Sequence, residues 1–241
     1  MLNRLVSVLF SFFQATLLMI FLMSCQSVDL KQINDQLANA RPLDNKTIVA
    51  GLKQALEVGT KNSVNLTSQK GGFSDNPLIR INTPQELDKL VSTLNKLGMG
   101  SYVSNFETQM NRAAENASAE AKQVFFNSIS KMSLRDGLNI LQGPDDAATQ
   151  FFRTTSTSEL TAKFKPIITR SMSKIGFYDD YKNLLKTYDA IPFTNKPDLN
   201  IENYLLQQTL DGLFTMIAKE ELKIRKEPAA RVTELLRRVF N

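Results

Sequence analysis

The sequence predicts an all-α protein, a single compact bundle of about nine or ten helices that follows an N-terminal signal and a tether. From residue 45 onward, apolar residues recur at helical spacing in almost every segment. No segment shows a sustained alternation of apolar and polar residues, which is typical of a half-buried strand. The chain has 241 residues, of which 42% are apolar, and this is sufficient for one domain with a large core.

Residues 1–24 have the pattern of a bacterial lipoprotein signal peptide. Arg4 gives a positive start, residues 5–22 are mostly apolar, and the small Ser24 precedes Cys25, the only cysteine of the chain. We therefore expect the Cys25 thiol to carry a diacylglycerol anchor that holds the protein at a membrane. An uncleaved membrane span is the alternative, because about 18 to 20 apolar residues can cross a bilayer.

The same pattern predicts where the protein is located. Gln26, and not aspartate, follows Cys25, which in enteric-type sorting favours the outer membrane. We expect a lipid-anchored protein of the bacterial cell envelope, at the outer membrane and facing the periplasm. Residues 25–44 are polar and are predicted to form a tether, and residues 45–241 are predicted to form the helical domain.

The first half of this domain is predicted to contain four helices. They cover about residues 45–66, 84–97, 102–115 and 121–132, and a short further helix runs from Ser133 to a stop at Gly143. Thr83 and Glu86 are spaced as a capping box with Pro84 at the first helical position, and Gly98 is expected to end its helix in a left-handed conformation. Residues 67–83 interrupt the pattern, and Leu78 to Ile81 is the one place where we allow an extended segment.

The second half is predicted to contain longer helices. Pro144 begins a helix with Asp145 and Asp146 in its first turn, and Ser156 to Glu159 is expected to cap a second one that ends at Gly176 and is kinked or divided at Pro166. Further predictions are a helix over residues 178–188, a loop over 190–199, a helix capped by Asn200 and a final amphipathic helix after Pro228. The helix after Asn200 is apolar over much of its circumference, which predicts a central position.

Four phrases of the sequence, taken in their order and spacing, resemble a known family. They are Asn76-Pro77-Leu78-Ile79-Arg80-Ile81, Met110-Asn111-Arg112-Ala113-Ala114-Glu115, Gly143-Pro144-Asp145-Asp146-Ala147-Ala148-Thr149 and Leu210-Asp211-Gly212-Leu213-Phe214. The family consists of exported, largely helical bacterial proteins, many of them lipoproteins, and is classed only as a domain of unknown function. The resemblance covers about residues 45–240, and Lys165 stands where the family pattern would have arginine. It implies compartment and fold, and it brings no catalytic residue, cofactor or substrate.

The composition limits the chemistry of the protein. The chain has no histidine, which excludes serine-histidine and cysteine-histidine catalysis and imidazole metal ligands. We expect no cofactor and no bound metal. The formal net charge of +5 is a weak argument for an acidic partner, and an exported chain without tryptophan is not expected to bind nucleic acid.

Six charged residues are the candidates for a binding site. Arg112 and Glu115 are three positions apart and share a helix face. Arg80 and Arg153 offer further guanidinium groups for Glu115, Asp145 or Asp146. We expect either an internal network of ion pairs that joins helices or a pocket for an anionic ligand. Asp145 and Asp146 have two interpretations of their own, stabilisation of a helix N-terminus or coordination of a hard cation, for which the segment lacks further ligands.

Two other patterns leave alternatives open. Glu107 with Glu115, or Asp179 with Asp180, could serve as the paired acids of a histidine-free hydrolase acting on an envelope glycan or ester. Residues 219–238 are basic and amphipathic, and they either cover the core or contact anionic lipid or cell-wall polymer. The leading hypothesis is a non-enzymatic binding or structural module that binds an envelope protein or a small ligand. A hydrolase and a periplasmic small-ligand binder are the alternatives.

Overall fold

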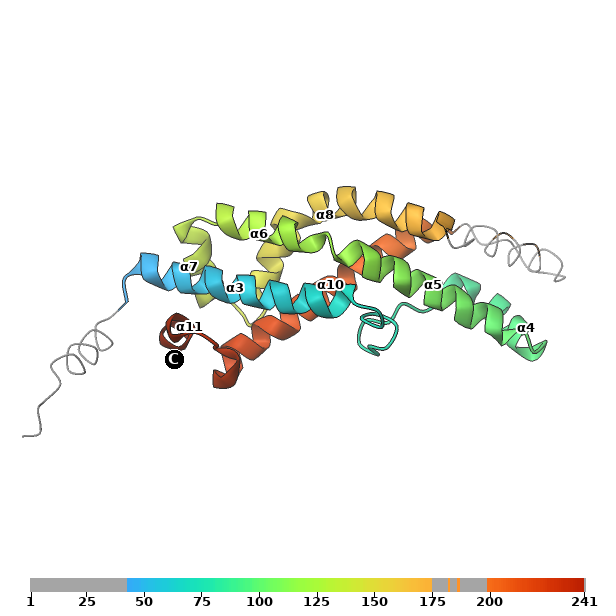
Figure 1. Cartoon of the computed structure of the whole chain (residues 1–241), viewed down its shortest axis with the longest axis horizontal. Coiled ribbons are helices and arrows are strands. Elements are labelled where there is room, and N and C mark those ends of the chain that lie inside the picture. The colour runs from blue at the N-terminus through green and yellow to red at the C-terminus, as the bar shows by residue number, and fades with distance from the viewer. Residues whose placement is uncertain (1–42, 175–181, 183–185, 187–198, 241) are drawn as a thin grey trace, which may run out of the picture. The chain divides into compact units, whose positions relative to one another are not determined.

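The computed structural model describes residues 43–174, 182, 186 and 199–240, and all regular elements in these ranges are helices (Figure 1). The described residues from Asn45 onward belong to one compact unit. The α-helices are α3 (Asn45–Ser68), α4 (Asp88–Lys96), α5 (Gly100–Ser118), α6 (Ala121–Lys131), α7 (Leu134–Gln142), α8 (Ala147–Lys174), α10 (Ile201–Lys226) and α11 (Glu234–Val239). Two short 3-10 helices, η1 (Gln85–Leu87) and η2 (Pro228–Ala230), complete the set. The all-α class is therefore confirmed.

The described residues contain fewer than the nine or ten helices that the sequence predicted. The described ranges contain seven α-helices of nine or more residues besides the six-residue α11. The main reason is α8, a single helix where the sequence predicted two. Ser156 does not cap a helix there, because its side chain is buried and its hydroxyl lies 2.8 Å from the hydroxyl of Ser128 on α6. Pro166 lies inside α8, which continues on both sides of it, and the predicted helix over residues 178–188 falls almost entirely outside the described residues.

Three local capping signals are confirmed, at Gly98, Ser133 and Asn200, whereas the capping box predicted at Thr83 does not form. Gly98 has φ 73°, and the N–H of the following residue, Met99, donates to the carbonyl of Leu94 (2.8 Å), so a Schellman motif ends α4. Ser133 and Asn200 accept hydrogen bonds from the N–H groups of Asp136 and Asn203 and cap α7 and α10. At the fourth end the chain forms η1 instead of a capping box, because the N–H and hydroxyl of Thr83 donate to Glu107.

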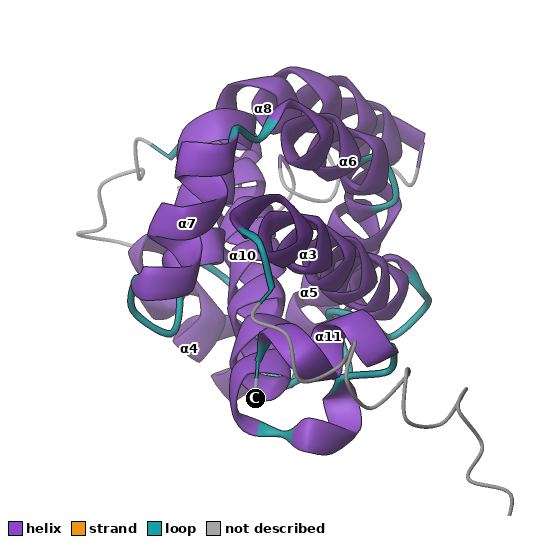
Figure 2. Ribbon diagram, turned by 90° about the vertical axis from the view of Figure 1, so that its left-hand side faces the viewer, coloured by secondary structure: helices purple, strands orange, loops and turns teal. Residues whose placement is uncertain are grey.

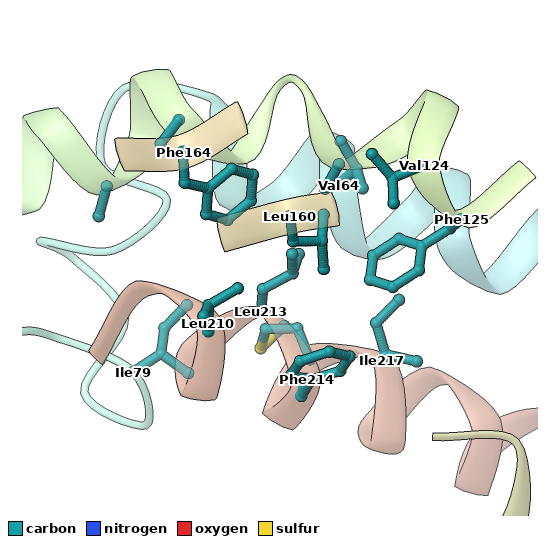
Figure 3. Close-up of a cluster of buried hydrophobic side chains, with 14 of the residues drawn as sticks. Val64, Ile79, Val124, Phe125, Leu160, Phe164, Leu210, Leu213, Phe214 and Ile217 are labelled. Carbon is teal, nitrogen blue, oxygen red and sulfur yellow. The ribbon is translucent and has the colours of Figure 1, made fainter. Parts of the chain in front are cut away.

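The central position predicted for the helix after Asn200 is confirmed. That helix, α10, packs against α3, α5 and α8, and Figure 2 shows it running among the other helices. Its buried apolar residues meet those of α3, α5, α6 and α8 in the main core (Figure 3). Phe125 of α6 is at the centre, with ring centroids 4.9 Å from Phe152 and 5.9 Å from Phe214. Each of these fully buried rings removes a large apolar area from water, which stabilises the fold.

Two smaller clusters extend the core. One is formed by the hairpin of α4 and α5 through Leu87, Leu90, Leu94 and Val103. The other joins α3, α10 and α11 through Ala55, Ile224 and Leu236. The segment between α3 and α4 joins the main core through buried Phe73, Ile79 and Ile81. Phe73 lies so close to Gly212 of α10 that a Cβ atom there would be 2.6 Å from the Phe73 ring, so the segment is held firmly against the helices.

Candidate functional site

A cavity of about 270 Å³ lies between α5 and the segment that joins α3 to α4. We call it the loop–α5 cavity. Its charged lining consists of three cations and two carboxylates, namely Lys70, Arg80, Arg112, Asp75 and Glu115, and Gly71, Ser74, Thr108 and Asn111 complete it. Three of the six charged residues singled out from the sequence, Arg80, Arg112 and Glu115, therefore meet at one place.

Glu115 is the structural centre of this cavity. Its side chain is buried, and its Oε1 atom accepts hydrogen bonds from the backbone N–H groups of Gly71 (3.1 Å), Phe73 (3.1 Å) and Ser74 (3.3 Å), and from the hydroxyl of Ser74. Gly71 has φ 86°, a conformation that favours glycine and lets the chain curl around the carboxylate. A carboxylate that satisfies several backbone donors holds a loop in place, so Glu115 fixes one wall of the cavity.

Asn111 and Glu107 of α5 hold the later part of the segment between α3 and α4. The side chain of Asn111 pairs with the backbone of Ile81, accepting from its N–H (2.9 Å) and donating to its carbonyl (2.7 Å). In this way an asparagine side chain takes the place of a neighbouring strand, and the extended segment that the sequence allowed around Ile81 forms no strand in the described structure. Glu107 accepts from the Thr83 N–H (3.1 Å) and from Arg80 (3.1 Å), which positions Arg80 at the rim.

The guanidinium of Arg112 has no such internal role. It is exposed, and no hydrogen bond or ion pair joins it or Lys70 to another residue within the described ranges. Of the two carboxylates in the lining, Glu115 already accepts several hydrogen bonds. The other, Asp75, forms no ion pair with Arg112 or Lys70 in the described structure. The cavity thus presents unengaged cationic donors, one of them a planar fork that suits a carboxylate or phosphate.

The other three predicted residues lie apart from the cavity. Arg153 of α8 forms an ion pair with Asp211 of α10 (3.1 Å), and its guanidinium carbon lies 4.5 Å from the ring centroid of Phe214. Asp145 forms an exposed ion pair with Lys226 (3.1 Å). Asp146 accepts from the side chain of Gln150 (3.0 Å). Two of these contacts join α8 and the turn before it to α10, and the third lies within the start of α8. The predicted lipidation residue, Cys25, lies outside the described residues.

Sequence reasoning missed an ion pair that organises the turn between α7 and α8. Glu221 of α10 accepts from the backbone N–H groups of Ala148 and Thr149, both at 2.9 Å. Arg225 pairs with Glu221 (2.8 Å) and also donates to the carbonyl of Ile140 (2.9 Å) at the end of α7. One pair therefore binds backbone groups at two helix ends, two N–H groups of α8 and a carbonyl of α7. The only sequence signal was a Glu and an Arg four residues apart.

The acids proposed as a catalytic pair have structural partners. Glu107 and Glu115 both accept hydrogen bonds from backbone N–H groups of the segment between α3 and α4, while Asp179 and Asp180 lie outside the described residues. In the part of the chain that the structure describes, no three acidic or other ligand side chains are grouped as a metal site. None of its helices is long and apolar enough to span a bilayer.

Comparison with known protein families identifies a match for most of the chain. A family model with the description "Protein of unknown function (DUF4197)" matches residues 42–241. No curated protein matches. No solved structure matches either. The match includes every residue of the loop–α5 cavity and of the Glu221–Arg225 pair.

Proposed function

The chain belongs to the DUF4197 family of proteins of unknown function, and we propose that its helical domain is a non-enzymatic module that binds a small anionic ligand in the loop–α5 cavity. The observation that carries this proposal is the state of Arg112. It lines the cavity together with Lys70 and Arg80, and it has no partner among the described residues. A guanidinium group beside a concave surface is suited to bidentate binding of a carboxylate or phosphate.

The rigidity of the walls supports the same proposal. Glu115 and Asn111 hold the loop to α5 through backbone hydrogen bonds that need no ligand. A preformed site avoids the cost of ordering a loop when the ligand binds. The volume of about 270 Å³ is close to the lower end of the range for small-molecule sites, so the expected ligand has the size of a phosphate ester or a small polycarboxylate.

Calorimetric titration of the full chain with inorganic phosphate and with citrate tests the proposal. At least one probe is expected to bind, and Arg112→Ala is expected to weaken that binding about tenfold, which corresponds to about 1.4 kcal/mol. Arg112→Lys keeps the charge but loses the planar fork, and an intermediate affinity is expected. The matched control is Arg170→Ala, which removes an exposed arginine of α8 that does not line the cavity.

Loss of affinity in Arg112→Ala with retention in Arg170→Ala supports the site. Equal affinity in both variants, or no binding of either probe to the native chain, would refute it. Circular dichroism of each variant shows whether the fold is kept, which is expected because both arginines are exposed.

We also propose that Cys25 anchors this module in the bacterial envelope. The support is the residue pattern before Cys25 and the polar segment over residues 25–44. Metabolic labelling with a palmitate analogue, followed by membrane fractionation, is the test. Cys25→Ser is expected to lose the label and to leave the membrane fraction, and an unchanged distribution would contradict the anchor.

A further inference from the structure

A second cavity, which we call the α7–α8 cavity, has a different chemistry. It lies between α7 and the first three turns of α8 and has a volume of about 400 Å³, within the range of small-molecule sites. Its polar side chains include Asp136, Asn139, Gln150 and Thr154, and Phe151 provides an aromatic wall. None of the described residues that line it is a lysine or an arginine.

The polar groups of this cavity are only partly used by the protein. Asn139 is exposed and forms no hydrogen bond with another residue in the described ranges. The side-chain amide of Gln150 donates one hydrogen bond to Asp146 (3.0 Å), so its carbonyl oxygen and its second N–H remain available to a ligand. The Thr154 hydroxyl donates to the backbone carbonyl of Gln150 (3.0 Å), so that its oxygen remains an acceptor. The cavity therefore offers neutral donors and acceptors side by side.

The single acid of the cavity is fixed in position and ionised. The N–H and the hydroxyl of Ser133 donate to the Oδ2 atom of Asp136 at 3.0 and 2.7 Å, and these hydrogen bonds lower the pKa of its carboxyl. The carboxylate keeps further lone pairs that can accept hydrogen bonds from hydroxyl groups. Phe151 is half-buried beside this polar edge.

From this lining we infer that the α7–α8 cavity binds an uncharged oligosaccharide. An anionic ligand would meet the Asp136 carboxylate in a cavity whose described lining has no lysine or arginine side chain, and a purely apolar ligand would leave the amides and the hydroxyl without partners. A sugar ring has an apolar C–H face for Phe151 and a rim of hydroxyl groups for Asn139, Gln150 and Asp136. The inference is independent of the anion site, which lies elsewhere on the domain and has the opposite charge.

The test is titration of the full chain with two uncharged probes, triacetylchitotriose and maltotriose, followed by ligand-observed NMR or calorimetry. Binding of at least one probe is expected. Asn139→Ala, which alters an exposed side chain, is expected to weaken it at least fivefold. Thr154→Trp, which places a large ring in the cavity, is expected to abolish it. The matched control is Ala162→Trp, which adds the same ring at an exposed position two turns further along α8.

Several results would overturn the inference. One is that neither sugar binds the native chain. A second is that a sugar binds Thr154→Trp and Ala162→Trp with equal affinity. A third is that trialanine binds while both sugars fail to bind, and that Thr154→Trp prevents the binding of trialanine. Arg112→Ala serves to separate the two sites. Unchanged sugar affinity in that variant is expected, and a loss there would place the sugar in the loop–α5 cavity and refute this assignment.

Discussion

The backbone N–H of Phe73 donates a hydrogen bond of 3.1 Å to the carboxylate of Glu115, 42 residues further along the chain. The same oxygen accepts from Gly71 and Ser74. The ring of Phe73 lies against Gly212 of α10, so this one residue connects the loop both to α5 and to the central helix. The wall of the candidate anion site is therefore part of the core.

Removal of the Glu115 carboxylate is expected to destabilise the whole domain. Glu115→Ala leaves one buried and two partly buried backbone N–H groups without an acceptor, and a loss of about 3 kcal/mol in the free energy of unfolding is expected. Glu115→Gln keeps an acceptor but not the charge, and about 1 kcal/mol is expected because charge-assisted hydrogen bonds are stronger than neutral ones. Urea denaturation measures both. Glu120→Gln, an exposed position, should be neutral, and a Glu115→Ala variant as stable as the native chain would contradict the role of this carboxylate.

Two glycines near the loop and the hairpin are expected to differ in their tolerance of alanine. A Cβ atom at Gly72 would overlap the backbone carbonyls of Leu66 and Thr67, whereas at Gly98 it would meet no atom within 4 Å. Gly98→Ala therefore costs only the strain of a left-handed residue, about 1 kcal/mol. Gly72→Ala must displace the end of α3, and a cost above about 2 kcal/mol is expected. Thermal melts of the two variants give the comparison, and the reverse order would show that the loop can move away.

The Glu221–Arg225 pair is expected to be worth far more than the exposed ion pairs of the same region. Both side chains are nearly buried, with exposed fractions of 5% and 11%, and they satisfy backbone groups of α7 and α8. Glu221→Ala leaves Arg225 without its carboxylate and two N–H groups without an acceptor, so a loss of about 3 kcal/mol is expected. Arg237→Ala breaks an exposed pair with Glu234 and should change stability by less than about 1 kcal/mol. Similar denaturation midpoints for the two variants would show that the pair has no special role.

Local signals made much of the fold predictable, while contacts across the chain did not follow from the sequence. The Ser133 cap, the Gly98 stop and the apolar circumference of α10 each depend on residues within a few positions of one another. The partners of Glu221 and Arg225 lie 73 and 85 residues away, and no local pattern indicates which helix ends they meet. The sequence predicted a helix start at Ser156 because serine is common at that position. In the structure Ser156 lies inside α8, where its buried hydroxyl contacts that of Ser128, and sequence spacing does not reveal this contact.

In the candidate site too, the neighbours on one helix could be predicted from the sequence, whereas the partners on other helices could not. Arg112 and Glu115 share a face of α5 because of helical spacing, and Arg80 joins them because Asn111 binds the neighbouring Ile81. Arg153 and Asp145 were plausible partners by charge alone. Their actual partners, Asp211 and Lys226, depend on how α8 lies against α10, which sequence spacing does not determine.

The capping box of α7 predicts a measurable pH effect. The hydroxyl of Ser133 and then its backbone N–H hold the pKa of Asp136 below its ordinary value of 3.8. Because the folded pKa is lowered, the stabilisation is complete above the ordinary pKa of the unfolded chain and is lost as the pH falls through the lowered value. Ser133→Ala removes the largest contribution, so the pKa of Asp136, followed by carboxyl ¹³C NMR, is expected to rise toward 3.8. The matched change Ser158→Ala, at an exposed serine of α8, should leave that titration where it is, and a Ser133→Ala curve identical to the native one would show that the hydroxyl does not control this carboxylate.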